Sequence, residues 1–130
     1  MASFDVSGEN DVPSTTGEDM LSVSVEWHGG VALLGVSGEV DALSAPRLER
    51  VVSDALEGNP KTLIIDLTKV GFLASAGLSV LANTHRQISH GIDFRVVAEG
   101  SATGRPLHLT GLDHDFAVYP SRDEALTTEE

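Results

Sequence analysis

The segment from Leu63 to Leu81 places the strongest constraint on how this 130-residue chain can fold. It opens with the apolar run 63–67, which has the length of a buried central strand. A turn follows and ends at residues 75–77. One face of a helix is then expected at Leu78, Leu81, Ala82, His85 and Ile88, with Gly91 ending the element. A buried strand that leads directly into a helix is typical of an α/β domain, in which helices connect parallel strands.

The flanking regions supply the other pieces of such a domain. Alternation over 21–25 predicts a half-buried strand, Gly29-Gly30 predicts a hairpin turn, and the apolar run 31–36 predicts a second strand. Further elements are expected as follows: a helix over 48–56 with Ser44 as its N-cap, strands near 94–97 and 116–119, a weak helical turn at 106–109, and a closing helical turn after a Ser121–Glu124 capping box. The predicted fold class is α/β, a single domain with a mixed β-sheet of about four to five strands and helices packed against it.

The acidic residues are distributed unevenly and suggest where this domain begins. The chain has 20 Asp and Glu against 8 Lys and Arg, a formal net charge of −12. Residues 1–19 contain five of these acids, no Lys or Arg, and no strand or helix period, which predicts an acidic disordered N-terminal tail. We therefore expect the domain to cover 20–126 and a short C-terminal tail to cover 127–130.

Composition also excludes several functions. A strongly acidic chain is a poor ligand for nucleic acid, whose phosphates favour clustered Lys and Arg. The absence of cysteine excludes disulfide scaffolds, thiolate zinc sites and cysteine nucleophiles. No apolar run is long enough to span a bilayer and no secretory signal pattern opens the chain, so we expect a cytoplasmic protein without membrane insertion. No cofactor is expected.

Ser75 is the most informative polar residue, and three roles are open to it. It can be an ordinary N-cap, the role that serine most often fills at a helix start. It can be a phosphorylation site, because free N–H groups and the helix dipole favour an anion there. A catalytic serine is disfavoured, because the nucleophile elbow needs glycine two residues before the serine and Leu73 stands there. The only acid and histidine partners downstream would be Asp93 with His108 or His114.

A histidine-rich segment near the end of the chain is a second candidate for chemistry. His108, Asp113, His114 and Asp115 could be taken for metal ligands, but their spacing matches no recognised site, and a solvated turn after Gly111 is the favoured interpretation. The segment 100–105 lacks the Lys-Ser/Thr pair of a nucleotide-binding loop. His85 is expected at the edge of the core.

Several motifs, in order along the chain, resemble one family. They are Gly38–Asp41 followed by a helix, then Asp66–Phe72, Ser75–Leu78, Leu109–Leu112 and Tyr119–Leu126. In this order and spacing they are similar to the STAS domain of bacterial anti-sigma factor antagonists, over nearly the whole predicted domain.

This resemblance implies a regulatory protein and not an enzyme. Family members bind an anti-sigma factor, usually a GHKL-type serine kinase, and so free a sigma factor. The kinase phosphorylates the serine that corresponds to Ser75, and a PP2C-type phosphatase reverses this. Partner contacts map to Asp41, Ser75, Gly77 and Leu78.

Three positions depart from the family pattern. Ala74 stands where the family usually has Asp, Ala76 lacks a common hydroxyl, and Ser79 replaces a glycine, which makes Ser79 a secondary phosphoacceptor candidate. Ala74 favours the alternative, a STAS scaffold that is not phosphorylated and instead senses a small ligand or supports a larger assembly such as a lipid-transport complex.

Overall fold

The structure, a computed structural model, describes residues 21–88 and 91–127. The expected tails, apart from Thr127, lie outside the described residues. The elements in chain order are β1 (Leu21–His28), β2 (Val31–Val40), α2 (Ala45–Glu57), β3 (Thr62–Leu73), α3 (Ser75–Gln87), β4 (Asp93–Val97), α4 (Gly104–Leu109), the 3-10 turn η2 (Leu112–His114), β5 (Ala117–Tyr119) and α5 (Arg122–Thr127).

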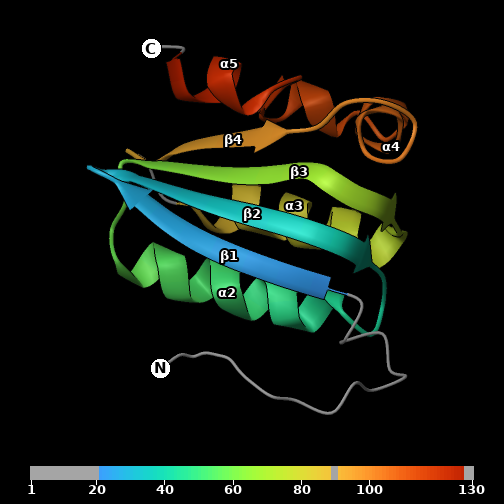
Figure 1. Cartoon of the computed structure of the whole chain (residues 1–130), viewed down its shortest axis with the longest axis horizontal. Coiled ribbons are helices and arrows are strands. Elements are labelled where there is room, and N and C mark those ends of the chain that lie inside the picture. Colours follow the sequence, from blue (N-terminus) through green and yellow to red (C-terminus); the bar gives the residue numbers. More distant parts are fainter. Residues whose placement is uncertain (1–20, 89–90, 128–130) are drawn as a thin grey trace.

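The strands form one five-stranded sheet in the order β1-β2-β3-β4-β5. β1 is antiparallel to β2, whereas β2, β3, β4 and β5 run parallel to their neighbours. The mixed α/β fold expected from the sequence is confirmed. Helices α2 and α3 lie on one face of this sheet, and α5 lies across the other (Figure 1).

Alternation along the central strand explains why both faces carry helices. Leu63 and Ile65 point to the α2 and α3 side and belong to the main core, whereas Ile64 packs with Ala125 of α5 in a second, smaller core. All three strand residues are fully buried, and burial of each such side chain contributes about 1.5–3 kcal/mol. The two cores hold the central strands in a fixed position, from which the loops at the strand ends project.

Two strands are longer than the apolar runs suggested. β2 extends to Val40 and β3 to Leu73, so the segment 68–73, interpreted as a turn, is strand. The polar residues Thr68 and Lys69 are exposed, and the pairing of β2 with β3 shifts register twice along this stretch. These irregularities interrupt the period-2 pattern without ending the strand.

The buried face of α3 also differs from the expected one. Its buried residues are Gly77, Val80, Leu81 and Thr84, while His85 is exposed and Leu78 is only half-buried. The helix itself was predicted correctly. Its buried face was predicted around Leu78, Leu81 and His85, whereas the face that packs on the core includes Gly77, because a glycine takes one of the core-facing positions.

Candidate functional site

The loops that follow β2 and β3 lie together at one end of the sheet. Parallel pairing aligns Val40 with Leu73, and the backbone N–H of Ala74 donates to the carbonyl of Val40 at 2.8 Å. The carboxyl ends of parallel strands are the usual location of sites in α/β folds. We call the surface formed here by Asp41, Leu43, Phe72, Ser75 and Leu78 the β2–β3 end.

Ser75 is exposed at the start of α3 but does not cap it. It is the first residue of the helix, and the N-cap is Ala74, in an extended conformation with no side-chain hydrogen bond. The interpretation of Ser75 as an N-cap is therefore wrong. Its hydroxyl forms no hydrogen bond within the part of the chain that the structure describes.

The first turn of α3 leaves two backbone donors free beside that hydroxyl. The N–H groups of Gly77 and Leu78 both point to the carbonyl of Ala74, at 2.9 and 3.1 Å. Those of Ser75 and Ala76 have no acceptor among the described residues. Free N–H groups and the positive end of the helix dipole make this turn a favourable environment for an anion.

Gly77 packs beneath the surface residues of the β2–β3 end. It is buried, and a Cβ placed on it would lie 2.6 Å from both Leu73 Cδ1 and Val40 Cγ1. The missing side chain lets α3 approach the strand ends this closely. Gly77 thus positions Ser75, and the surface that a partner could touch is formed by the residues around it.

Asp41 shapes the loop that joins β2 to α2. Its Oδ1 accepts hydrogen bonds from the backbone N–H groups of Leu43 and Ser44, each at 3.0 Å. The bond from the Ser44 N–H is the main cause that lowers the pKa of Asp41 below its ordinary value, so this carboxyl stays ionised. Ser44 is the N-cap residue of α2, as expected, but its buried hydroxyl makes no capping hydrogen bond and donates to the carbonyl of Glu39 at 2.9 Å.

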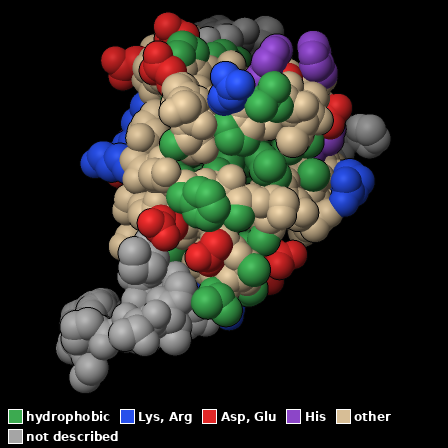
Figure 2. Space-filling model, turned by 90° about the vertical axis from the view of Figure 1, so that its right-hand side faces the viewer, with side chains coloured by type: hydrophobic (Ala, Val, Ile, Leu, Met, Phe, Trp, Pro, Cys, Tyr) green, Lys and Arg blue, Asp and Glu red, His purple; other side chains and the backbone are tan. Residues whose placement is uncertain are grey.

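Two large hydrophobic side chains of the β2–β3 end are exposed to solvent. Leu43 is 62% exposed and Phe72 is 51% exposed, and Leu78 beside Ser75 is half-buried. Figure 2 shows hydrophobic side chains across the middle of this end of the molecule. Neither residue was singled out from the sequence. The available signals were the position of Leu43 two residues after Asp41, and that of Phe72 at the end of the Asp66–Phe72 motif, three residues before Ser75.

The arrangement does not support a hydrolase. No histidine or carboxylate is hydrogen-bonded to Ser75 in the described residues, and His85 lies ten residues along α3, about 15 Å away. His108 is instead bonded to Asp113 through Nδ1 at 2.9 Å.

The histidine segment forms a local polar cluster. His114 Nε2 lies 3.9 Å from the same carboxyl, and the hydrogen bond from His108 is the main cause that lowers the pKa of Asp113. Within the described ranges, no three His, Asp or Glu side chains are grouped so as to hold a metal ion.

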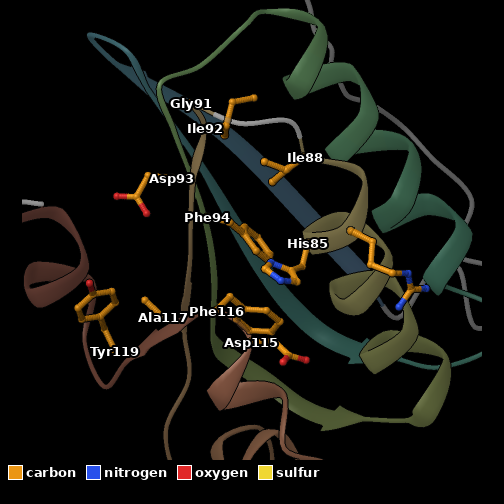
Figure 3. A pocket seen from close by; sticks show the side chains of 11 residues that line it. His85, Ile88, Gly91, Ile92, Asp93, Phe94, Asp115, Phe116, Ala117 and Tyr119 are labelled. Atoms are coloured by element: carbon orange, nitrogen blue, oxygen red, sulfur yellow. The ribbon is translucent and has the colours of Figure 1, made fainter.

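A cavity of about 730 Å³ lies at the opposite end of α3 (Figure 3). Its wall includes Phe94 and Phe116, whose ring centroids are 5.0 Å apart, and the exposed ring of His85, which lies 5.9 Å from Phe116. His85 therefore packs at the edge of the core, as expected, with no part in the β2–β3 end.

The fold and this surface define a small α/β module whose candidate site is an exposed docking surface. The STAS domain model matches residues 22–125. The chain is 44% identical over 109 residues to the anti-sigma-F factor antagonist RsfB of Mycobacterium tuberculosis, a match that covers 84% of this chain and 89% of that protein. An anti-sigma F factor antagonist of Paenibacillus polymyxa is 25% identical over 109 residues, covering 82% of this chain and 93% of the relative.

A solved structure of an anti-sigma factor antagonist is also similar to this chain. The crystal structure of an anti-sigma factor antagonist from Mycobacterium paratuberculosis matches with a TM-score of 0.80 and 47% identity, over 82% of this chain and 92% of that one. The chain belongs to the STAS-domain family of anti-sigma factor antagonists. No helix in the described residues is long and apolar enough to cross a membrane.

Proposed function

We propose that this protein releases a sigma factor by partner switching. In this proposal the β2–β3 end binds an anti-sigma factor of the GHKL-type serine kinase class, and phosphorylation of Ser75 ends the interaction. A PP2C-type phosphatase restores binding. The observation that carries the proposal is the exposed, unbonded hydroxyl of Ser75 on a surface where segment 72–79 has no charged side chain.

Phosphorylation at this position acts more strongly on the partner than on the fold. A phosphate adds about −1.5 to −2 charges at pH 7 and three acceptor oxygens. In the free protein, water and the N–H groups of Ser75 and Ala76 solvate that charge. In a complex, an apolar partner surface over Leu43 and Phe72 would bury the charge without a counter-ion, which opposes binding.

The proposal is tested by titrating the candidate anti-sigma factor with three variants. Ser75→Ala should bind like the wild type, whereas Ser75→Asp and Ser75→Glu should bind at least about tenfold more weakly, since a desolvated charge costs more than 1.4 kcal/mol. Asn83→Asp is the matched control, because it adds one negative charge to the same helix two turns beyond the site. Equal affinity of all these proteins would refute the proposal.

A second function is favoured by one observation, the alanine at position 74. A STAS module that is not phosphorylated would need no acidic residue before Ser75, and would act as a scaffold or small-ligand sensor. Intact-mass measurement after incubation with the candidate kinase and ATP separates the two. One added phosphate on the peptide that contains Ser75 supports the switch, and an unchanged mass supports the scaffold.

A further inference from the structure

Strand β1 forms an open edge of the sheet. It is the outermost strand in the order β1-β2-β3-β4-β5, and Figure 1 shows it beside α2 with no strand outside it in the described chain. Its eight residues, LSVSVEWH, contain neither Pro nor Lys and show no register shift against β2. Proteins usually shorten, bend or charge such edges, because an unbroken edge is a template for pairing with another chain.

The hairpin geometry shows which backbone groups of β1 face outward. His28 pairs with Val31 across the two-residue turn Gly29-Gly30, so the backbone of His28 is bonded to β2. Alternation then turns the N–H and C=O groups of Trp27, Val25 and Val23 away from β2. These groups have no hydrogen-bond partner among the described residues.

The same alternation marks where the free edge begins. Leu21 is also an outward-facing residue, and its carbonyl accepts a hydrogen bond from Arg47 Nη1 of α2 at 2.8 Å. The open edge therefore covers the stretch from Val23 to Trp27.

Apolar side chains accompany this free backbone. Val25 is 43% exposed and Trp27 is 47% exposed on the side of the sheet that faces α2. Trp27 packs against Gly58 at the end of α2, where an added Cβ would lie 2.8 Å from its ring. The indole is thus held in place by its own chain and still presents about half of its surface.

We propose that β1 pairs antiparallel with β1 of a second copy of this chain, around a two-fold axis at Val25. This register places Val23 opposite Trp27 of the other copy and Ser24 opposite Glu26. Pairs of an aromatic with a β-branched side chain stabilise antiparallel strands, and no two like charges lie directly opposite. The three outward-facing residues of each strand would exchange about six backbone hydrogen bonds.

Charges on α2 favour a second copy over an unrelated strand. Arg47 and Arg50 lie in its first half and Asp54 and Glu57 in its second, spaced so that all four fall on one stripe of the helix. The contact of Arg47 with Leu21 places this stripe on the β1 side. The two-fold axis makes the two α2 helices antiparallel, so the basic half of each faces the acidic half of the other.

The dimer leaves both copies able to bind a partner. β1 begins beside the end of β2, so the start of β1 lies at the β2–β3 end of each copy. Antiparallel pairing sends the two β2–β3 ends to opposite ends of one continuous sheet. The contact is limited to one strand edge and one helix stripe, so the dimer should be weak and dependent on concentration.

Sedimentation of the full chain over a wide concentration range tests the proposal. The wild type should shift from monomer to dimer, and Val25→Lys should raise the dissociation constant at least about tenfold, because it places two like charges at the axis. Leu109→Lys is the control, since Leu109 is 67% exposed in α4, away from β1, and should leave the dimer intact. Circular dichroism checks that both variants remain folded.

Cross-linking tests the register of the strand pair. Because the chain has no cysteine, an introduced cysteine is the only thiol that can react. Val25→Cys should be joined efficiently by a short bismaleimide, because the two thiols lie across the axis, whereas Leu109→Cys should give little cross-linked dimer. A chain that stays monomeric at every concentration overturns the proposal. A dimer that Val25→Lys does not weaken would also overturn it. Equal cross-linking of Val25→Cys and Leu109→Cys would overturn it as well.

Discussion

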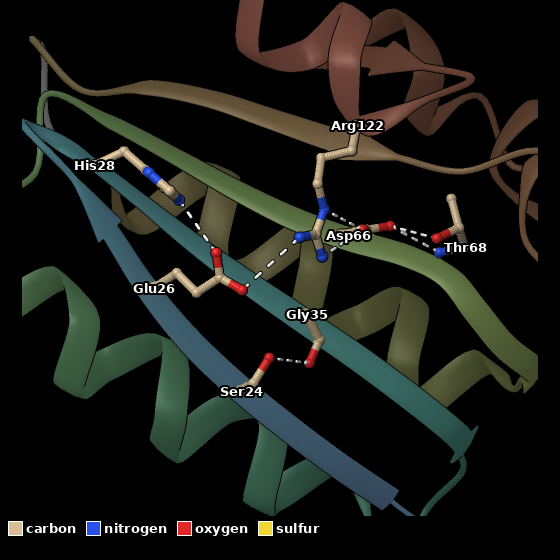
Figure 4. Close-up of polar contacts among 7 residues, drawn as sticks. All are labelled: Ser24, Glu26, His28, Gly35, Asp66, Thr68 and Arg122. Atoms are coloured by element: carbon tan, nitrogen blue, oxygen red, sulfur yellow. Dashed lines mark hydrogen bonds and ion pairs between the residues drawn. The ribbon is translucent and has the colours of Figure 1, made fainter.

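Arg122 in α5 and Asp66 in β3, 56 residues apart in the sequence, form an ion pair on the face of the sheet that carries α5. Both Nε and Nη2 of Arg122 lie 2.8 Å from Oδ2 of Asp66, while Oδ1 of Asp66 accepts bonds from the N–H and hydroxyl of Thr68 (Figure 4). Gly35 makes room for the guanidinium, since a Cβ there would lie 3.3 Å from it. The last helix is thereby attached to the central strand.

Replacing Arg122 should destabilise the protein. Arg122→Ala leaves the nearly buried carboxylate of Asp66 without its cation, and we expect a loss of about 1–3 kcal/mol in the free energy of unfolding. Because Arg122 is partly exposed, water replaces some of the lost interaction and favours the lower part of this range. Urea denaturation measures the loss. Arg50→Ala, at an exposed arginine of α2, should change the stability by less than about 0.5 kcal/mol, and equal losses in the two variants would contradict the prediction.

A carboxylate in place of Ala74 should stabilise the protein. The N-cap of α3 has no side-chain acceptor, and Ala74→Asp supplies one to the free N–H groups of the first turn. The expected gain is about 0.5–2 kcal/mol at pH 7, measured by urea denaturation. Ala82→Asp, in the middle of the same helix, should give no gain. If Ala74→Asp is only as stable as the wild type, the prediction is wrong, and the N–H groups of the first turn gain nothing from a side-chain acceptor.

A methyl group on Gly77 should disrupt the packing beneath Ser75. Alanine favours a helix over glycine by about 1 kcal/mol, but here the new Cβ overlaps Leu73 and Val40 at 2.6 Å. Overpacking costs about 1–3 kcal/mol, so Gly77→Ala should lower the melting temperature. Gly71→Ala is the control, because nothing lies within 4 Å of the Cβ it would add, and its melting temperature should stay close to that of the wild type.

The exposed apolar residues of the β2–β3 end should contribute to binding and not to stability. Leu43→Ala and Phe72→Ala remove side chains that are mostly in water in the free protein. Each should weaken binding of the anti-sigma factor by about 1–3 kcal/mol in a calorimetric titration, with little change in unfolding. Val25→Ala removes a similarly exposed side chain from another surface. If it weakens binding as much as Phe72→Ala, the β2–β3 end is not the docking surface.

The sequence was sufficient for the order and type of the elements, because each has its own periodicity. The hydroxyl of Ser121 accepts the N–H of Glu124 at 3.2 Å as the capping pattern predicted, and Gly29 has the positive φ that a hairpin turn needs. These features depend on neighbours in the chain. Local patterns therefore predicted them correctly.

Features that depend on distant residues could not be predicted in this way. The length of β3 is set by its pairing with β2 along residues that are themselves polar, such as Lys69. Ser75 was interpreted as a cap because serine prefers that position, whereas the strand pairing that extends to Leu73 moves the cap to Ala74. Leu43 and Phe72 were not singled out, because the sequence does not show that these two apolar side chains are exposed.

The hydroxyl of Ser75 contributes no hydrogen bond to the described part of the fold. A serine that caps a helix cannot be replaced or esterified without a loss of stability, so its chemistry and the survival of the fold are linked. Here the fold assigns the cap to Ala74 and leaves Ser75 without a structural task. In the proposed switch, mutation could therefore remove, restore or imitate the phosphate at Ser75 in single steps, with each intermediate a folded protein on which selection can act.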